Sequence, residues 1–277
     1  MATPPDRGSD SRLRRGYADG PFGQIHYVRA GRGEPVLLLH QTPRSWDEFE
    51  GVIELLAGSF DLIAMDLPGM GASDAAPGSP TIEGYGDAAV ALLDALGLSE
   101  VDVFGHHTGS FVAADIAARN PDRVRSVMLS APAWGDAEFR AANSDPETLG
   151  VDNATPEQSG EYLLELWRQR QPFYPSGSTE LLATFMRDAL RVEDPRAGHI
   201  ACGRFELDVA FERIACPMLL IGFAEDPHSF PHMEQFTSRA PEAAVRVIET
   251  GTVPLDAHPQ EVAAAIEEFL ASRQAVE

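Results

Sequence analysis

The stretch Val101-Asp-Val-Phe-Gly105-His106-His107-Thr108-Gly109-Ser110 gives the strongest indication of how this 277-residue chain folds. Residues 101–105 are mainly apolar, as in a strand buried on both faces, and a helix is predicted from about Thr108. Glycines stand two positions before and two positions after His107. Such glycines are needed where a strand turns sharply into a helix, because the central residue is strained and helix and strand pass closely. We therefore predict a strand–turn–helix unit with His107 at the turn.

Strand and helix patterns alternate on both sides of this unit. Before and just after it, the apolar patterns predict strands at residues 22–29, 35–40, 60–66, 101–106 and 124–130, with helices at 45–57, 82–96 and 108–119. The alternation resumes later in the chain, with strands at 217–222 and 244–249 and a helix at 259–272. Regular alternation of this kind predicts an α/β fold with a mostly parallel, doubly wound sheet and helices on both faces.

The alternation stops between the two halves of this pattern. Residues 133–214 contain a polar loop and amphipathic segments at 161–169 and 179–192, which predict an inserted helical cap. We expect the core of the fold to comprise residues 17–132 and 215–277. Residues 1–16 lack periodicity and are rich in Pro, Gly, Asp and Arg, so we expect them to form a flexible leader.

Composition excludes several classes of function. A net charge of −22 argues against nucleic acid and against anionic membranes, because both are bound by clustered cations. No apolar run approaches the roughly 18–20 residues that span a bilayer, and the first residues lack the apolar segment of a signal peptide. The two cysteines, Cys202 and Cys216, are expected to be reduced thiols. We expect a cytoplasmic protein, either monomer or homodimer, that binds a small molecule.

Four further motifs lie along the chain. They are His40-Gln41-Thr42-Pro43, Asp66 to Asp74 with its Gly-x-Gly-x-Ser core, Gly222-Phe-Ala-Glu-Asp226, and Thr250-Gly-Thr252-Val-Pro254 followed by His258-Pro259. Together with the turn at His107, these motifs and their order resemble the α/β-hydrolase fold superfamily, and the layout is similar to that of the capped epoxide hydrolases and dehalogenases. The resemblance implies an α/β-hydrolase fold, an enzyme, and a catalytic centre at the turn before residue 108.

The departures from this resemblance concern the catalytic residues themselves. In that family the turn carries a nucleophilic serine, whereas His107 stands there in this chain. Thr252 stands where the family has its catalytic histidine, and only the acid position, Asp226, matches. A shift of the alignment by a gap would instead bring His258 to the site. Gln41 replaces the glycine of the loop that supplies one oxyanion donor.

These substitutions predict a site centred on an imidazole. The resemblance implies that the backbone amides of Thr42 and Thr108 form an oxyanion hole. We expect His107 to act as a general base, as a nucleophile or as a hydrogen-bond donor, and its place at a helix N-terminus favours the neutral ring. Asp226 is expected to contact His107 directly. The expected catalytic residues are thus His107, Asp226 and Thr252.

The expected substrate-binding residues are Gln41, Trp134 and His258. We expect no metal, because His-x-x-x-His and Cys-x-x-Cys spacings are absent and the adjacent His106 and His107 should point in opposite directions. His40, His106 and Asp66 are interpreted as structural. No cofactor is expected either, because the Gly69-Met-Gly71 segment lacks the third glycine and the helix of a dinucleotide site.

Three functions remain open at this point. The first is hydrolysis of an ester, lactone or activated carbonyl compound through His107. The second is a non-hydrolytic reaction at the same site, as in a lyase, isomerase or cyclase, since one fold hosts both chemistries. The third is a non-catalytic protein that keeps the pocket and binds a ligand.

Overall fold

The computed structural model describes residues 12–145, 156–251 and 253–274. Its centre is an eight-stranded sheet with the strand order β1-β2-β4-β3-β5-β6-β7-β8. The strands β1 and β2 are antiparallel to their neighbours, and the other strands pair in parallel. The strands are β1 (Arg14–Gly20), β2 (Gly23–Gly31), β3 (Pro35–Leu39), β4 (Asp61–Met65), β5 (Val101–His106), β6 (Val124–Ser130), β7 (Met218–Phe223) and β8 (Ala244–Ile248).

Helices pack on both faces of this sheet and bury two apolar clusters. On one face lie α1 (Glu50–Leu56), α10 (Pro254–Ala257) and α11 (Pro259–Gln274). On the other lie α2 (Ile82–Ala95), α3 (Thr108–Arg119), α8 (Leu207–Phe211) and α9 (Met233–Arg239). The central strands β4 and β5 are buried along their whole length, and β3 is buried after Pro35, because helices cover both faces of the sheet. The mostly parallel α/β fold predicted from the alternation is thus confirmed.

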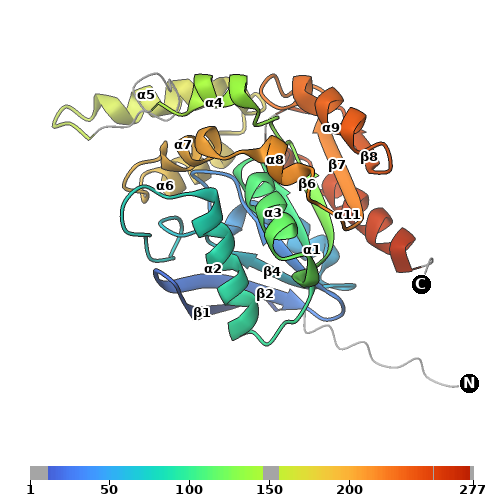
Figure 1. Cartoon of the computed structure of the whole chain (residues 1–277). Helices are drawn as coiled ribbons and strands as arrows, with labels where there is room; N and C mark the ends of the chain where they lie inside the picture. Colours follow the sequence, from blue (N-terminus) through green and yellow to red (C-terminus); the bar gives the residue numbers. More distant parts are fainter. Residues whose placement is uncertain (1–11, 146–155, 252, 275–277) are drawn as a thin grey trace, which may run out of the picture.

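The described residues between β6 and β7 are helical. They form α8 on the face described above, and α4 (Ala137–Asn143), α5 (Glu161–Arg170), α6 (Thr179–Ala189) and α7 (Ala197–Arg204), which cover one end of the sheet (Figure 1). An apolar cluster joins α5 to α6 through residues such as Leu166, Leu182 and Phe185. The described residues also form short 3-10 turns, which are η1 (Trp46–Phe49), η2 (Pro121–Arg123), η3 (Gln171–Phe173) and η4 (Phe230–His232).

The N-terminal boundary differs from the prediction. Residues 14–16 were expected in the leader, but β1 begins at Arg14, which pairs with Arg29 of β2. The sequence does not predict this strand, because β1 lies at the edge of the sheet and is largely exposed. Its residues therefore lack an apolar repeat. The rest of the expected leader, residues 1–11, lies outside the described residues.

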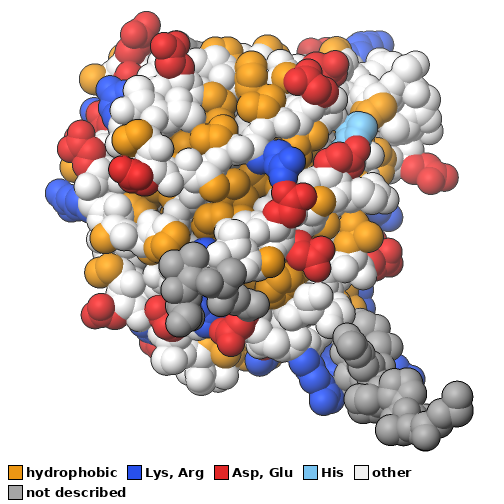
Figure 2. All heavy atoms as spheres, turned by 90° about the vertical axis from the view of Figure 1, so that its right-hand side faces the viewer, with side chains coloured by type: hydrophobic (Ala, Val, Ile, Leu, Met, Phe, Trp, Pro, Cys, Tyr) orange, Lys and Arg blue, Asp and Glu red, His pale blue; other side chains and the backbone are white. Residues whose placement is uncertain are grey.

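The surface mixes charged and apolar side chains. Figure 2 shows the face on the β8 side, where acidic side chains are spread among apolar ones. The edge strand β8 contributes exposed Val245 and Val247 to the surface. Within the described part of the chain, no helix is both long enough and apolar enough to cross a membrane.

Candidate active site

The turn between β5 and α3 holds His107 in a backbone conformation that side chains rarely adopt. Its φ is 44° and its ψ is −110°. The His107 N–H donates to the Ser130 carbonyl at 2.9 Å, and the His107 carbonyl accepts from the Ser110 N–H at 2.9 Å. A Cβ atom at Gly105 would strike the Gly109 carbonyl, and one at Gly109 would strike the Leu39 carbonyl. The flanking glycines therefore permit the close packing of the turn that the sequence predicted.

Asp226, which the resemblance identifies as the acid position, lies beside His107, although the two residues are 119 positions apart in the sequence. It follows β7, and its Oδ2 atom is 3.5 Å from Nε2 of His107. The Asp226 carboxylate also accepts hydrogen bonds from the backbone N–H of His228, at 2.9 Å, and from the Ser229 hydroxyl. These two bonds fix a carboxylate that is only 1% exposed. The structure thus brings His107 and Asp226 together.

Burial keeps the His107 imidazole neutral. It lowers the pKa of His107 to about 4, against the opposing effect of the Asp226 carboxylate, and His228, His199 and Arg170 lower it further. A neutral imidazole carries one proton, and a carboxylate beside Nε2 favours the tautomer with the proton on Nε2. The Nδ1 atom then keeps its lone pair and is available to accept a proton.

The two threonines expected in the oxyanion hole lie next to each other. The Thr42 N–H points to Thr108 Oγ1 at 3.4 Å. Thr108 is the first residue of α3, so its backbone N–H has no acceptor within the helix. Thr108 lines the cavity, while Thr42 is 2% exposed just behind it. Their role toward a substrate stays a prediction.

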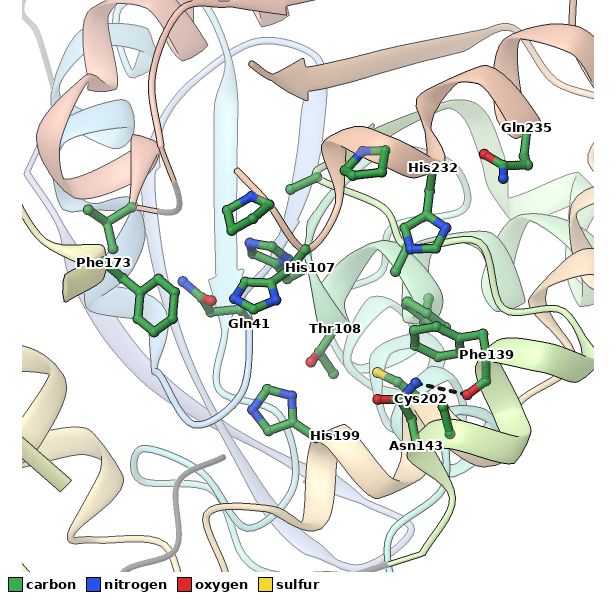
Figure 3. A pocket seen from close by; sticks show the side chains of 18 of the residues that line it. Gln41, His107, Thr108, Phe139, Asn143, Phe173, His199, Cys202, His232 and Gln235 are labelled. Carbon is green, nitrogen blue, oxygen red and sulfur yellow. Dashed lines mark hydrogen bonds between the residues drawn. The ribbon is translucent and has the colours of Figure 1, made fainter. Parts of the chain in front are cut away.

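A cavity of about 660 Å³ opens in front of His107 (Figure 3). This volume is in the range that holds a small organic ligand, about 300–1,000 Å³. Figure 3 shows Gln41, His107, Thr108 and His199 around one space, with Phe173 and Phe139 to either side. The polar residues that line the cavity are Gln41, His107, Thr108, Asp136, Glu138, Asn143, Arg170, Tyr174, His199, Cys202, His228, His232 and Gln235.

Several lining residues were not predicted from the sequence. His199 lies on α7, Arg170 on α5 and Asn143 on α4, so each reaches the cavity through the packing of the helices between β6 and β7. His228 and His232 follow Asp226 in the loop after β7 and also line the cavity. For His228 and His232, a position close to Asp226 in the sequence indicates that they lie near the site. For Asn143, Arg170 and His199, no sequence pattern indicates it.

Two predicted binding residues lie elsewhere. Trp134 is part of the core, where its ring packs edge-on against Phe211 at 5.5 Å and Phe236 at 4.9 Å between centroids, with Arg239 over its face at 4.5 Å. His258 precedes α11, is 40% exposed in its side chain and lies 3.5 Å from Glu261. Neither residue lines the cavity. A large aromatic ring is equally suited to a pocket and to a core, and here the Trp134 ring belongs to the core.

Thr252 lies outside the described residues. Its neighbour Val253 lines the cavity, so the chain on the C-terminal side of this position borders the site. The prediction that Thr252 is a catalytic residue therefore stays a prediction.

The residues interpreted as structural make internal hydrogen bonds. His40 accepts the Leu67 N–H at Nε2, at 2.9 Å, and its Nδ1 atom lies 2.7 Å from the Gln41 carbonyl. Asp66 accepts the backbone N–H groups of Trp46 and Ala72, each at 2.8 Å. Both side chains therefore hold the loops below the cavity.

His106 supports His107 from inside the fold. It is fully buried, its Nδ1 atom lies 3.0 Å from Ser130 Oγ, and its ring packs against the His107 ring with 4.5 Å between centroids.

In the part of the chain that the structure describes, no group of three or more His, Cys, Asp or Glu residues is arranged to hold a metal ion.

The comparisons agree with this architecture. The model of the alpha/beta hydrolase fold family matches residues 34–160. Over 93% of this chain and 98% of the other, the structure superimposes on a hydrolase from Pseudomonas aeruginosa PA01 with a TM-score of 0.80 and 19% identity, a likeness that shows the fold alone. The chain therefore has the α/β-hydrolase fold.

Two relatives illustrate the range of proteins that share sequence with the chain. It is 38% identical over 111 residues to the soluble epoxide hydrolase of Corynebacterium sp. strain C12, and this aligned segment covers 38% of this chain and only 37% of that enzyme. It is 24% identical over 231 residues to the (E)-2-((N-methylformamido)methylene)succinate hydrolase of Acinetobacter baylyi, which covers 81% of this chain and 85% of that enzyme.

Proposed function

We propose that this protein is an enzyme that hydrolyses a small, largely apolar organic substrate with an ester, lactone or activated carbonyl group. His107 is its central catalytic residue. The observation that carries the proposal is the contact between His107 Nε2 and Asp226 Oδ2 at 3.5 Å, at the turn where this fold presents its reactive side chain. An imidazole that is half-buried, neutral and next to a carboxylate is suited to general-base catalysis.

The proposed reaction uses these groups in the following order. A water molecule between His107 Nδ1 and the substrate attacks the carbonyl carbon while Nδ1 accepts its proton. Asp226 stabilises the imidazolium that forms, as an acid does for its histidine in a catalytic triad. The backbone amides of Thr42 and Thr108 bind the oxygen that becomes negative. His107 then returns the proton to the leaving oxygen, which yields an acid and an alcohol.

Direct attack by Nδ1 on the carbonyl carbon is the related nucleophilic route. It forms an acyl-imidazole, which water then hydrolyses. The hydrolase names of the two relatives support hydrolysis over the alternatives. The same neutral base also supports a second candidate, removal of an acidic C–H proton that leads to elimination, isomerisation or cyclisation.

The test compares wild type with His107→Ala on a panel of small aryl esters and lactones. We expect hydrolysis by wild type and a loss of about 10²–10⁴-fold in kcat/KM in the variant. His258→Ala is the matched control, because this exposed histidine lies outside the cavity and its loss should leave turnover unchanged. Turnover by His107→Ala equal to that of wild type contradicts the proposal.

A serine-directed fluorophosphonate gives an independent check. Since residue 107 is a histidine and Ser110 is buried with its hydroxyl bonded to the Gly105 and Ser130 carbonyls, we expect no labelling at the turn. Among the described residues that line the cavity there is no serine, so stoichiometric labelling of any serine contradicts a histidine-centred site.

A further inference from the structure

Gln41 is held by a buried carboxylate behind the cavity. Its backbone N–H donates to Glu48 Oε2 at 3.0 Å, and its side-chain Nε2 donates to Glu48 Oε1. Glu48 lies in η1 and is 2% exposed. The buried guanidinium of Arg44, whose Nη1 atom is 3.9 Å from Glu48 Oε1, faces this carboxylate from the other side. One carboxylate therefore engages both the backbone and the side chain of Gln41.

This arrangement determines which end of the amide faces a ligand. The nitrogen of the Gln41 side chain is directed to Glu48, so the oxygen Oε1 is the end left for the cavity that Gln41 lines. Figure 3 shows this oxygen on the side of the amide nearer His107. An amide oxygen accepts hydrogen bonds and cannot donate them. The wall of the cavity thus carries an oriented acceptor.

The acceptor stands next to the expected reaction centre. Gln41 directly precedes Thr42, whose N–H lies 3.4 Å from Thr108 Oγ1, and Thr108 directly follows His107. Consecutive Cα atoms are only about 3.8 Å apart. A substrate carbonyl bound by the amides of Thr42 and Thr108, as in the proposed function, therefore lies close to Gln41, with the groups on its neighbouring carbon within reach of the amide.

We infer that Gln41 selects substrates that carry a hydroxyl or N–H donor on the carbon next to the reacting carbonyl, and that Glu48 is the positioning residue that orients its amide. This inference rests on the proposed function for the meaning of "reacting carbonyl". A ligand without the donor displaces water from Gln41 Oε1 without replacing its hydrogen bond, which weakens binding. A ligand with the donor restores that bond.

The test measures binding rather than turnover, so that its failure is distinct from failure of the proposed chemistry. The probes are N,N-dimethylmandelamide, as separate enantiomers, and N,N-dimethyl-2-phenylacetamide, which differ by one hydroxyl and lack an ester bond. Isothermal titration calorimetry is run at about pH 8, where Glu48 is ionised although burial raises its pKa to about 7. On wild type it should show one mandelamide enantiomer binding roughly tenfold tighter than the deoxy ligand, the factor given by about 1.4 kcal/mol.

Three variants distinguish the steps of the inference. Gln41→Met keeps the length of the side chain without an acceptor and should bring the affinity ratio to about one. Glu48→Gln frees the amide to turn and should reduce the ratio while Gln41 is still present. His107→Ala should keep the wild-type ratio, because it removes the base and not the acceptor. Circular dichroism confirms that each variant is folded.

The inference is overturned if wild type does not distinguish the ligands or binds neither. It is also overturned if Gln41→Met keeps the wild-type ratio. A ratio that survives in Glu48→Gln overturns the positioning role of Glu48 alone. Loss of ester hydrolysis in His107→Ala with an unchanged ratio supports both proposals separately.

Discussion

The Nε2 atom of His107 lies 3.5 Å from Oδ2 of Asp226, so a single imidazole at the turn meets the acid directly. In the family layout that the sequence resembles, the turn residue and the acid are joined through a separate histidine. Here the side chain of His107 itself extends from the turn to the acid. His107 therefore occupies the turn and also lies next to the acid position, where the family has a separate histidine as its base.

Asp226→Asn tests whether this support matters for catalysis. The amide keeps the size of the side chain and can still accept from the His228 N–H, but it cannot stabilise an imidazolium. We expect kcat/KM to fall by about 10²–10⁴-fold, with most of the loss in kcat, since the charge forms only during the reaction. Steady-state kinetics on the best ester of the panel measure this. Unchanged turnover in the folded variant would contradict the pairing.

The pH dependence of activity tests the state of His107. Burial lowers the pKa of His107 to about 4, so the base is neutral above that pH and becomes protonated as the pH falls through it. We expect kcat/KM to stay level from about pH 8 to pH 5 and to fall only near pH 4, because kcat/KM reports the pKa of the free enzyme. Far-UV circular dichroism at each pH checks that the fold persists. A midpoint near the ordinary histidine pKa of about 6.5 would contradict the lowered pKa of His107.

Gly109→Ala tests the turn that positions His107. A Cβ atom at this position would collide with the backbone carbonyl of Leu39, which cannot move without shifting β3. We expect a loss of about 1–3 kcal/mol or more in the free energy of unfolding. Gly58→Ala is the matched control, because a Cβ atom there meets nothing within 4 Å. Urea unfolding of both variants measures the difference, and equal stabilities would show that the turn is not packed as described.

The elements around the turn were predictable from the sequence because their causes are local. The helix expected at residues 108–119 is α3, and the strand expected at 124–130 is β6, with the same bounds. Apolar periodicity and the two glycines define these elements without any knowledge of the tertiary structure. The helix expected at 45–57 is instead the 3-10 turn η1 followed by α1, a difference in hydrogen bonding that periodicity does not detect.

The site was predictable only where its residues come from strand ends. Gln41, His107 and Asp226 follow parallel strands, whose carboxyl ends meet at one edge of the sheet, and all three lie at the site. His199 and Arg170 come from helices whose placement depends on packing over that edge. Their side chains reach the cavity through tertiary contacts that no local pattern encodes.

A buried cation, Arg44, joins the loop after β3 to the helices α6 and α10. Arg44 is fully buried, and its guanidinium contacts Asp188 of α6 at 3.0 Å and Asp256 of α10 at 2.6 Å, with Asp47 at 3.4 Å and Glu48 at 3.9 Å. Arg44→Met keeps most of the side-chain volume but leaves these carboxylates without their cation. We expect the free energy of unfolding to fall by about 3–5 kcal/mol at pH 8.

The pH dependence of this loss separates charge from packing. Burial raises the pKa of Glu48 and of Asp188 to about 7, so the folded state holds protons on these groups that the unfolded state releases above about pH 4. Their contribution to stability therefore decreases as the pH rises from about 4 through 7. In Arg44→Met the carboxylates can be neutralised at low pH, so the loss should be smaller at pH 5.5 than at pH 8. Arg246→Met, which breaks an exposed pair with Glu268, should cost about 0–1 kcal/mol at either pH. If urea unfolding gives Arg44→Met the same small, pH-independent loss as Arg246→Met, Arg44 does not neutralise the buried carboxylates.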